Sequence, residues 1–241
     1  MDEDRVSSNI PVEIPAELRN TFIKEHGIIN FFAIAAFFLL IAPFLSVHRV
    51  TDFMIFCIFA MSFDLLYGYM GLLSFGHMLY LGTGAYCCGL FIQYIEGNPL
   101  VAILMGICGA GALAMILGLI IVRTTGACFA LINLAFNHMG FFLVLSPLYK
   151  ITRGEDGFGV SASKLGFLNF GSRPFMFGFV LLSLVVVFYF LRRLTSSPYG
   201  ILIRSIKEDE TRVRFLGYNT FFYKWLTFSI AGSVAGLAGS L

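Results

Sequence analysis

Long stretches with almost no charged side chains constrain this sequence more than any other feature. An α-helix rises about 1.5 Å per residue and the hydrocarbon core of a bilayer is about 30 Å thick, so about 20 consecutive apolar residues can span it. Such stretches occupy residues 27–47, 53–95, 97–122, 124–149, 174–191 and 225–241. The second stretch is too long for one span and suits two helices joined by a tight connection. We therefore predict an all-α fold, a polytopic transmembrane helical bundle of about seven spans.

The overall composition fits a protein whose surface faces lipid. Of the 241 residues, 58% are apolar and 12% are charged, whereas soluble domains carry roughly 25% charged residues. The formal net charge of +2 gives nucleic-acid binding no support. All five cysteines lie inside apolar stretches, where we interpret them as small packing residues rather than as a disulfide framework.

Charge distribution predicts how the chain sits in the membrane. Residues 1–26 form a polar tail that lacks the basic start and apolar core of a secretory signal, so we expect it to remain uncleaved. Residues 27–241 form the transmembrane domain. Cytoplasmic loops are enriched in lysine and arginine. With residues 192–224 in the cytoplasm, eleven such side chains lie inside and five outside, and the N-terminal tail is cytoplasmic.

A cluster of glycines predicts a broken helix near residues 68–84. Glycine costs about 1 kcal/mol in a helix interior, and five glycines fall within these 17 residues: Gly68, Gly71, Gly76, Gly82 and Gly84. Inside a membrane, irregular backbone is tolerated only where it is buried in protein or lines a polar cavity, and broken helices are typical of substrate paths. Asp64 favours this interpretation, because a carboxylate in an apolar span usually faces the interior. The alternative is that the glycines only permit close helix packing.

A second, charged constellation lies between two apolar stretches, at residues 194–219. Ser197 can cap a helix with Pro198 at its first position, and Gly217 suits the far end. Leu202, Ile206, Val213 and Leu216 share one side at near-helical spacing. The segment is thus predicted to be one amphipathic cytoplasmic helix. It either rests on the membrane surface or docks onto a soluble partner, and the acidic run at 208–210 disfavours a purely lipid-facing role.

Motifs of enzymatic chemistry are missing from the sequence. It contains no G-x-x-x-x-G-K-[ST], G-x-S-x-G or H-E-x-x-H pattern, so we predict neither ATP binding through a P-loop nor an enzyme. His77 and His138 each stand without a second ligand at metal spacing. No metal site and no cofactor are predicted.

Four sequence blocks together resemble a known family. They are DLLYGYMGLLSFGH at 64–77 with GTGAY at 82–86, RTTGACFALINLAF at 123–136, TRGEDG at 152–157, and SPYG at 197–200 with KEDE at 207–210, LG at 216–217 and AGLAG at 235–239. Their order and spacing resemble the permease subunits of branched-chain amino acid type ATP-binding-cassette importers, specifically the LivM-like half. The resemblance covers residues 28 to 241.

The resemblance implies partners, a location and a substrate class. The partners are a second, LivH-like permease subunit, two cytoplasmic ATP-binding subunits and an extracytoplasmic solute-binding protein, and the location, among membrane lipid, is the cell inner membrane. The solute would be a branched-chain amino acid, urea or a short amide. The family's chains run on for roughly two further spans, so its C-terminal spans are expected to be missing here.

The resemblance also implies which residues act. The candidate substrate path comprises Asp64, Tyr67, Gly68, Gly71, Ser74, Gly76, His77, Phe129, Asn133 and Asn137. The candidate residues of ATPase coupling are Ser197, Pro198, Tyr199, Gly200, Arg204, Glu208, Asp209, Glu210 and Gly217. This sequence departs from the family at Asn133, where threonine is usual, and at Arg212 and Val213, where the family often has two alanines.

Two other functions stay open at this point. A secondary transporter would use Asp64 for proton or sodium coupling. An intramembrane enzyme would need Asp64, Ser74 and His77 to converge, although no nucleophile motif supports it.

Overall fold

A computed structural model describes most of this chain. It describes residues 36, 38, 46–95, 98–147, 149–152, 164–165, 168–169 and 173–241. The chain divides into two compact units, Met1–Phe44 and Leu45–Leu241, and the second contains nearly all of the described residues. The predicted tail at 1–26, almost all of the predicted span at 27–47, and residues 153–157 of the third family block lie outside them.

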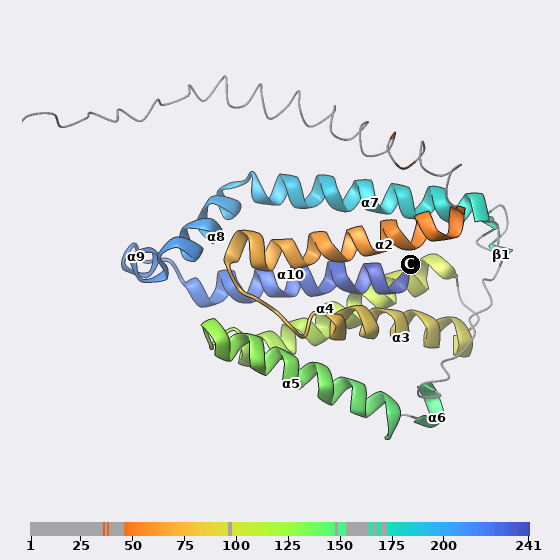
Figure 1. The fold of residues 1–241 in the computed structure, drawn as a ribbon, viewed down its shortest axis with the longest axis horizontal. Helices are drawn as coiled ribbons and strands as arrows, with labels where there is room; N and C mark the ends of the chain where they lie inside the picture. The colour runs from red at the N-terminus through yellow and green to blue at the C-terminus, as the bar shows by residue number, and fades with distance from the viewer. Residues whose placement is uncertain are drawn as a thin grey trace, which may run out of the picture. The chain divides into compact units, whose positions relative to one another are not determined.

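Helices dominate the described chain (Figure 1). They are α2 (Val47–Asp64), the π-helix η1 (Leu65–Tyr69), α3 (Met78–Ile95), α4 (Pro99–Ile121), α5 (Gly126–Leu145), α6 (Tyr149–Thr152), α7 (Arg173–Thr195), α8 (Pro198–Glu208), α9 (Glu210–Phe215) and α10 (Thr220–Ser240). The strands β1 (Lys164–Leu165) and β2 (Leu168–Asn169) form a small antiparallel pair, with Lys164 opposite Asn169 and Leu165 opposite Leu168.

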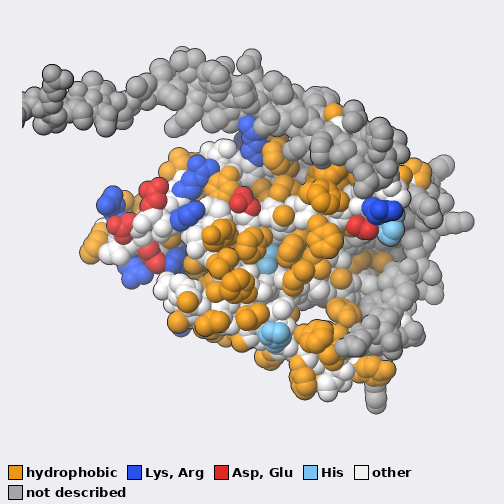
Figure 2. Space-filling view, in the orientation of Figure 1, with side chains coloured by type: hydrophobic (Ala, Val, Ile, Leu, Met, Phe, Trp, Pro, Cys, Tyr) orange, Lys and Arg blue, Asp and Glu red, His pale blue; other side chains and the backbone are white. Residues whose placement is uncertain are grey.

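Four of these segments are long and apolar enough to cross a membrane, namely Val47–Tyr69, Pro99–Ile121, Gly126–Leu145 and Pro174–Thr195. Helices α3 and α10 form at two further predicted positions but are not among those four. The helical membrane class is therefore as predicted, whereas a count of about seven spans is not confirmed. Figure 2 shows hydrophobic side chains across the middle of one face, with most charged side chains gathered at the α8–α9 end. Such a belt suits contact with lipid.

Helix α10 lies at the centre of the Leu45–Leu241 unit, packed against α2, α3 and α4. Small residues permit this approach. A Cβ added to Gly84 on α3 would overlap the backbone of Gly236 on α10, and a Cβ on Gly236 would overlap the Ala110 side chain on α4. Gly239 lies equally close to the Leu81 carbonyl. Backbones that meet through small residues are the usual way to pack helices in lipid.

The predicted helix break is present but shorter than expected. Helix α2 continues directly into η1, which ends at Tyr69, and α3 begins at Met78. In Figure 1 the intervening chain leaves the α8 end of the bundle and runs back beside α10 before α3 begins part-way along. Gly82 and Gly84 lie inside regular α3, so their assignment to the break is wrong. For Gly84 the close-packing alternative is the correct one.

The predicted single amphipathic helix is two helices. The backbone of Asp209 is extended, with φ −154° and ψ 94°, and separates α8 from α9. The Asp209 carboxylate accepts a hydrogen bond from the Arg212 N–H at 3.0 Å and so caps α9. Gly217, with φ +87°, follows the end of α9 as predicted, in a conformation that favours glycine.

Candidate functional site

The break between η1 and α3 is held from both sides. Gly71 has φ +74°, which favours glycine, and its N–H donates to the Tyr67 carbonyl at 3.1 Å. A Cβ on Gly76 would overlap the Asn133 carbonyl of α5. The chain therefore passes directly against α5 before α3 begins. Ser74 and His77 are buried there.

His77 occupies an aromatic niche at the start of α3. Its Nε2 lies 2.9 Å from the Ser62 hydroxyl of α2. The ring centroids of Phe59, Phe63 and Tyr80 lie 5.3, 6.0 and 5.9 Å from that of His77. Sequence reasoning missed Ser62 and Tyr80, because nothing in the spacing of α2 residues indicates which of them meets the end of the break.

The candidate path residues fall into two groups. Ser74, Gly76, His77, Phe129 and Asn133 are buried together where the break meets α5. Asp64 and Tyr67 are exposed, so the expectation that the Asp64 carboxylate faces the interior of this chain is wrong. Gly68 and Asn137 are half-buried, and Gly71 is exposed.

The α5 side of this region is fixed by two buried residues. Phe129 packs edge-on against Phe228 of α10, with ring centroids 6.0 Å apart. The Asn133 amide donates to the Phe129 carbonyl one turn earlier at 3.2 Å. Its amide nitrogen thus bonds within α5, while its backbone contacts Gly76.

Helix α8 packs closely on the end of the bundle. Gly200 lies against the Thr195 carbonyl, with no room for a Cβ. The Thr227 hydroxyl donates to the Tyr223 carbonyl, so the Tyr199 hydroxyl, 2.6 Å from Thr227 Oγ1, is the donor of that second bond. Ser197 occupies the N-cap position, but its hydroxyl donates backwards to the Leu194 carbonyl at 2.6 Å, so the predicted side-chain cap is absent.

Two cations of α8 contact the broken helix directly. Lys207 Nζ donates to the Gly68 carbonyl of η1 at 2.7 Å. The Arg204 guanidinium lies 4.8 Å from the ring centroid of Tyr69. A cation at the carbonyl end of a helix is favourable, since the last carbonyls lack partners within the helix. The charged segment is therefore attached to the break by polar contacts as well as by packing.

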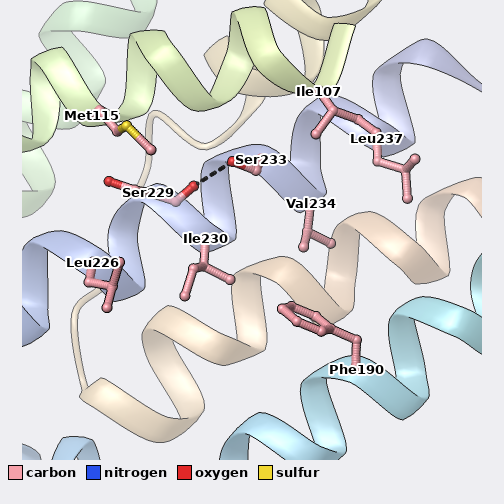
Figure 3. A pocket seen from close by; sticks show the side chains of 9 residues that line it. All are labelled: Ile107, Met115, Phe190, Leu226, Ser229, Ile230, Ser233, Val234 and Leu237. Carbon is pink, nitrogen blue, oxygen red and sulfur yellow. Dashed lines mark hydrogen bonds between the residues drawn. The ribbon is translucent and has the colours of Figure 1, made fainter. Parts of the chain in front are cut away.

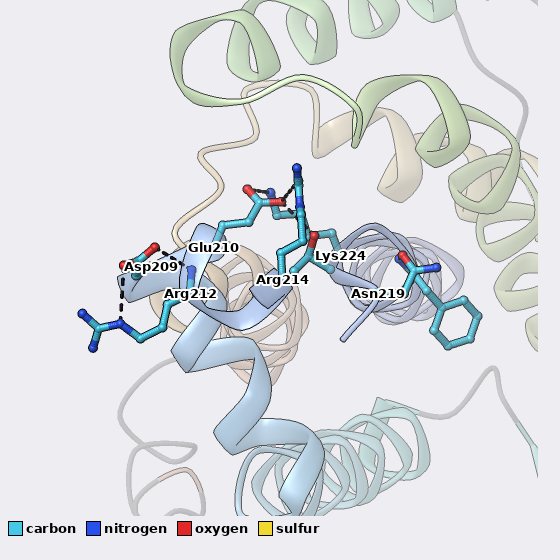
Figure 4. A network of polar contacts seen from close by, with 8 residues as sticks. Asp209, Glu210, Arg212, Arg214, Asn219 and Lys224 are labelled. Carbon is cyan, nitrogen blue, oxygen red and sulfur yellow. Dashed lines mark hydrogen bonds and ion pairs between the residues drawn. The ribbon is translucent and has the colours of Figure 1, made fainter. Parts of the chain in front are cut away.

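Helix α9 is joined to α10 by a network around Glu210 (Figure 4). The Glu210 carboxylate accepts hydrogen bonds from Lys224 at 2.5 Å, Thr220 at 3.0 Å and Arg214 at 3.4 Å. Lys224 is buried, so Glu210 neutralises an ammonium that water cannot reach freely. Sequence reasoning missed Lys224, although a lysine beside an apolar span is itself a signal for such a partner.

The surroundings of Glu210 change its acidity. Partial burial acts to raise the pKa of this carboxyl. The hydrogen bond and charge of Lys224, together with the contacts to Thr220 and Arg214, outweigh burial and hold the pKa below its ordinary value. The pair with Lys224 therefore stabilises the folded protein above the unfolded-state pKa of about 4.3, and that contribution is lost as the pH falls through the lower folded-state pKa.

Glu210→Gln should lower the melting temperature of the purified protein at pH 7. Removing one partner of a buried, hydrogen-bonded charge costs roughly 2 kcal/mol. The deficit should shrink as the pH falls below the unfolded-state pKa of about 4.3, because wild-type Glu210 also becomes protonated as the pH falls through its lower folded-state pKa. Glu208→Gln, at an exposed position on α8, is the control and should melt as the wild type does. A Glu210→Gln deficit that is independent of pH would contradict this assignment.

The tip between α9 and α10 presents large apolar side chains. Phe215 is 87% exposed, Leu216 is 72% exposed, and Tyr218 is 47% exposed. Leu216 was expected to share one side of a single helix with Ile206 and Val213, and that expectation is wrong because the extended Asp209 divides the segment into two helices. The side chains that do face the bundle are Ile203, Ile206 and Val213. An apolar tip surrounded by charges is typical of a protein-binding surface.

An apolar groove of about 280 Å³ lies between α4, α7 and α10 (Figure 3). It is lined by Ile107, Met115, Phe190, Leu226, Ser229, Ile230, Ser233, Val234 and Leu237. The hydroxyls of Ser229 and Ser233 donate to carbonyls of their own helix, Trp225 and Ser229. Its polar groups are thus already satisfied, and the groove suits apolar contact rather than recognition of a polar solute.

Within the described ranges, no group of three histidine, cysteine, aspartate or glutamate side chains is placed to hold a metal ion.

Comparison with known proteins gives a consistent family. Residues 45–241 match the family described as branched-chain amino acid transport system / permease component. The high-affinity branched-chain amino acid transport system permease protein LivM of Escherichia coli K12 is 26% identical over 87% of this chain and 56% of its own length. Its counterpart in Salmonella typhimurium LT2 is 28% identical over 81% and 52%.

A third relative gives a similar match. The probable branched-chain amino acid transport permease protein LivM of Methanocaldococcus jannaschii is 25% identical over 78% of this chain and 64% of its own length. The chain thus spans between half and two thirds of the length of these relatives. No solved structure matches it.

Proposed function

The chain belongs to the branched-chain amino acid transport system / permease component family, and from this premise we propose that it is the transmembrane permease subunit of an ATP-binding-cassette importer. It would move a small polar solute such as a branched-chain amino acid, urea or a short amide across the cytoplasmic membrane. The names of the relatives favour a branched-chain amino acid. The N-terminus and the α8–α9 end would face the cytoplasm.

One observation carries this proposal: a charged docking segment that is attached to a broken membrane helix. A permease without its own ATPase must receive motion from outside the membrane and pass it to the solute path. Lys207 and Arg204 contact η1 immediately before the break. Movement of α8 would therefore displace η1 and the following chain together, as in a rigid-body switch between two states.

The partners of this proposal are those that the family resemblance implies. Two cytoplasmic ATP-binding subunits would drive the permease, with Phe215 and Leu216 of the exposed tip as the apolar contact. A second, LivH-like permease would complete the path, and an extracytoplasmic binding protein would deliver the solute. An ion-coupled transporter using Asp64 finds less support, because this carboxylate is exposed on the chain.

Reconstitution of the complete importer in lipid vesicles tests the proposal. We expect uptake of L-leucine that requires ATP and the ATP-binding subunits, and none in response to a proton or sodium gradient alone. Uptake driven by an ion gradient without ATP-binding subunits would overturn it.

Replacement of the apolar tip tests the ATPase contact separately. The double variant Phe215→Ser, Leu216→Ser should lose ATP-binding subunits on purification while the permease remains in the membrane, because large apolar side chains dominate such contacts. Phe222→Ser, at an exposed aromatic of α10, is the control and should retain them. Retention of the subunits by the double variant would place the contact elsewhere.

A further inference from the structure

Three buried polar atoms at the start of α3 have no hydrogen-bond partner in the described part of the chain. They are Ser74 Oγ, His77 Nδ1 and Tyr80 Oη. The three side chains are only 2%, 2% and 1% exposed. Buried polar atoms are nearly always hydrogen-bonded, so three unpaired atoms within seven residues require an explanation. They lie where the break meets α5, which is the solute path of the proposed function.

The hydrogen bonds around Ser62 fix which nitrogen of His77 carries the proton. The Ser62 hydroxyl donates its hydrogen to the Phe59 carbonyl at 2.6 Å. It can therefore only accept from His77 Nε2, 2.9 Å away, which places the proton of a neutral imidazole on Nε2. His77 Nδ1 is then a bare acceptor. It requires a ligand that donates a hydrogen bond.

The surroundings define the ligand further. Aromatic rings of Phe59, Phe63 and Tyr80 surround the imidazole, and aromatic faces attract cations and apolar groups. No ion pair of the described chain reaches Ser74, His77 or Tyr80. A site without a compensating charge favours a ligand whose own charges cancel.

We propose that Ser74, His77 and Tyr80 bind the zwitterionic head of an α-amino acid in transit. The ammonium group has three N–H donors, and the site offers three acceptors in His77 Nδ1, Ser74 Oγ and Tyr80 Oη. Each hydroxyl keeps its own hydrogen to donate to the solute's carboxylate. The apolar side chain of the solute lies among the aromatic rings. This inference rests on the proposed function and assigns three residues to the charged head of its solute.

Helix α5 lies beside the residues that flank this site. Helix α5 covers the chain through the contact between Asn133 and Gly76 and through Leu79, which lies against Gly140. Of the four candidate spans, α5 has the smallest share of residues buried within the protein, at 17%. Helix α5 thus flanks the proposed site at Gly76 and Leu79, whereas His77 lies against α2 and Tyr80 lies against α10.

Removal of single hydroxyls distinguishes a binding site from a packing defect. In the reconstituted importer, Tyr80→Phe and Ser74→Ala should each lower ATP-driven L-leucine uptake about tenfold, because each loses one hydrogen bond to a charged group. Both should also raise the melting temperature of the solute-free complex, since each removes an unpaired buried polar atom. Tyr94→Phe, at an exposed position of the same helix, should change neither quantity. Wild-type uptake in both hydroxyl variants would overturn the inference.

The ¹⁵N resonance of His77 Nδ1 gives an independent test of this hydrogen bond. In the complex labelled with ¹⁵N-histidine, the resonance of His77 Nδ1, assigned by its loss in His77→Gln, should move to lower frequency when L-leucine is added. 4-Methylpentanoate, which has the same side chain and carboxylate but no amino group, should leave it in place. An equal response to both compounds would overturn the amino-group assignment while ATP-driven uptake still upheld the proposed function. A wild-type importer without ATP-driven uptake would overturn both.

Discussion

Leucine in place of Gly84 should leave almost no folded protein in the membrane. A Cβ at this position overlaps the carbonyl oxygen of Gly236, and neither backbone can withdraw because α10 is held by α2 and α4 as well. Inserting atoms into a packed interface costs about 1–3 kcal/mol where side chains can yield. Here the obstacle is backbone, so we expect a larger loss. Membrane-inserted, monodisperse protein after detergent extraction is the quantity to measure.

Gly82→Leu is a matched control for this prediction. Gly82 lies two residues earlier on the same helix, and a Cβ there meets no atom within 4 Å. The substitution also replaces glycine by a better helix former, a gain of about 1 kcal/mol. Gly82→Leu should therefore yield as much folded protein as the wild type, or more. Equal yields from Gly84→Leu and Gly82→Leu would contradict the packing of α3 against α10.

These two glycines illustrate what could be predicted from the sequence. The cluster of five glycines at 68–84 correctly indicates a disturbed helix, because glycine is unfavourable inside a regular helix. It does not indicate which glycines lie in the break and which permit close packing. That distinction depends on Gly236, which is 152 positions from Gly84 and contacts it only when α10 packs against α3. The lengths of the apolar stretches predicted most of the helices. They do not indicate which helix packs against which.

The acidic run at 208–210, in α8 and α9, also shows that the sequence does not indicate which partner each residue contacts. Three consecutive acids look alike in the sequence, where together they disfavour a purely lipid-facing role. In the structure Glu208 is exposed, Asp209 caps α9, and Glu210 pairs with Lys224. Only the cap has a local signature, an aspartate with its bonding N–H three residues later. The pair depends on how α9 folds back onto α10.

Lys207→Met should uncouple ATP hydrolysis from transport. The Lys207 ammonium holds the Gly68 carbonyl at the end of η1, and its side chain lies against Gly71 at the start of the break. Loss of a partly exposed hydrogen bond from a charged donor is worth about 1.5 kcal/mol, or about tenfold in the balance between two conformations. We expect L-leucine taken up per ATP hydrolysed to fall about tenfold. The hydrolysis rate and the amount of assembled complex should stay near wild type, since α8 remains anchored through Ile203 and Ile206.

Two further variants separate this link from a general effect of positive charge. Lys207→Arg keeps a cation that can still donate to the Gly68 carbonyl, so it should recover most of the coupling. Arg193→Met removes an exposed cation from the end of α7 without touching the broken helix, and should couple normally. If Arg193→Met uncoupled the importer as strongly as Lys207→Met, the positive charge of the whole α7–α8 end would be responsible. If only Lys207→Met does so, the hydrogen bond from Lys207 to the Gly68 carbonyl is a coupling contact between α8 and η1, beside the contact of Arg204 with the Tyr69 ring.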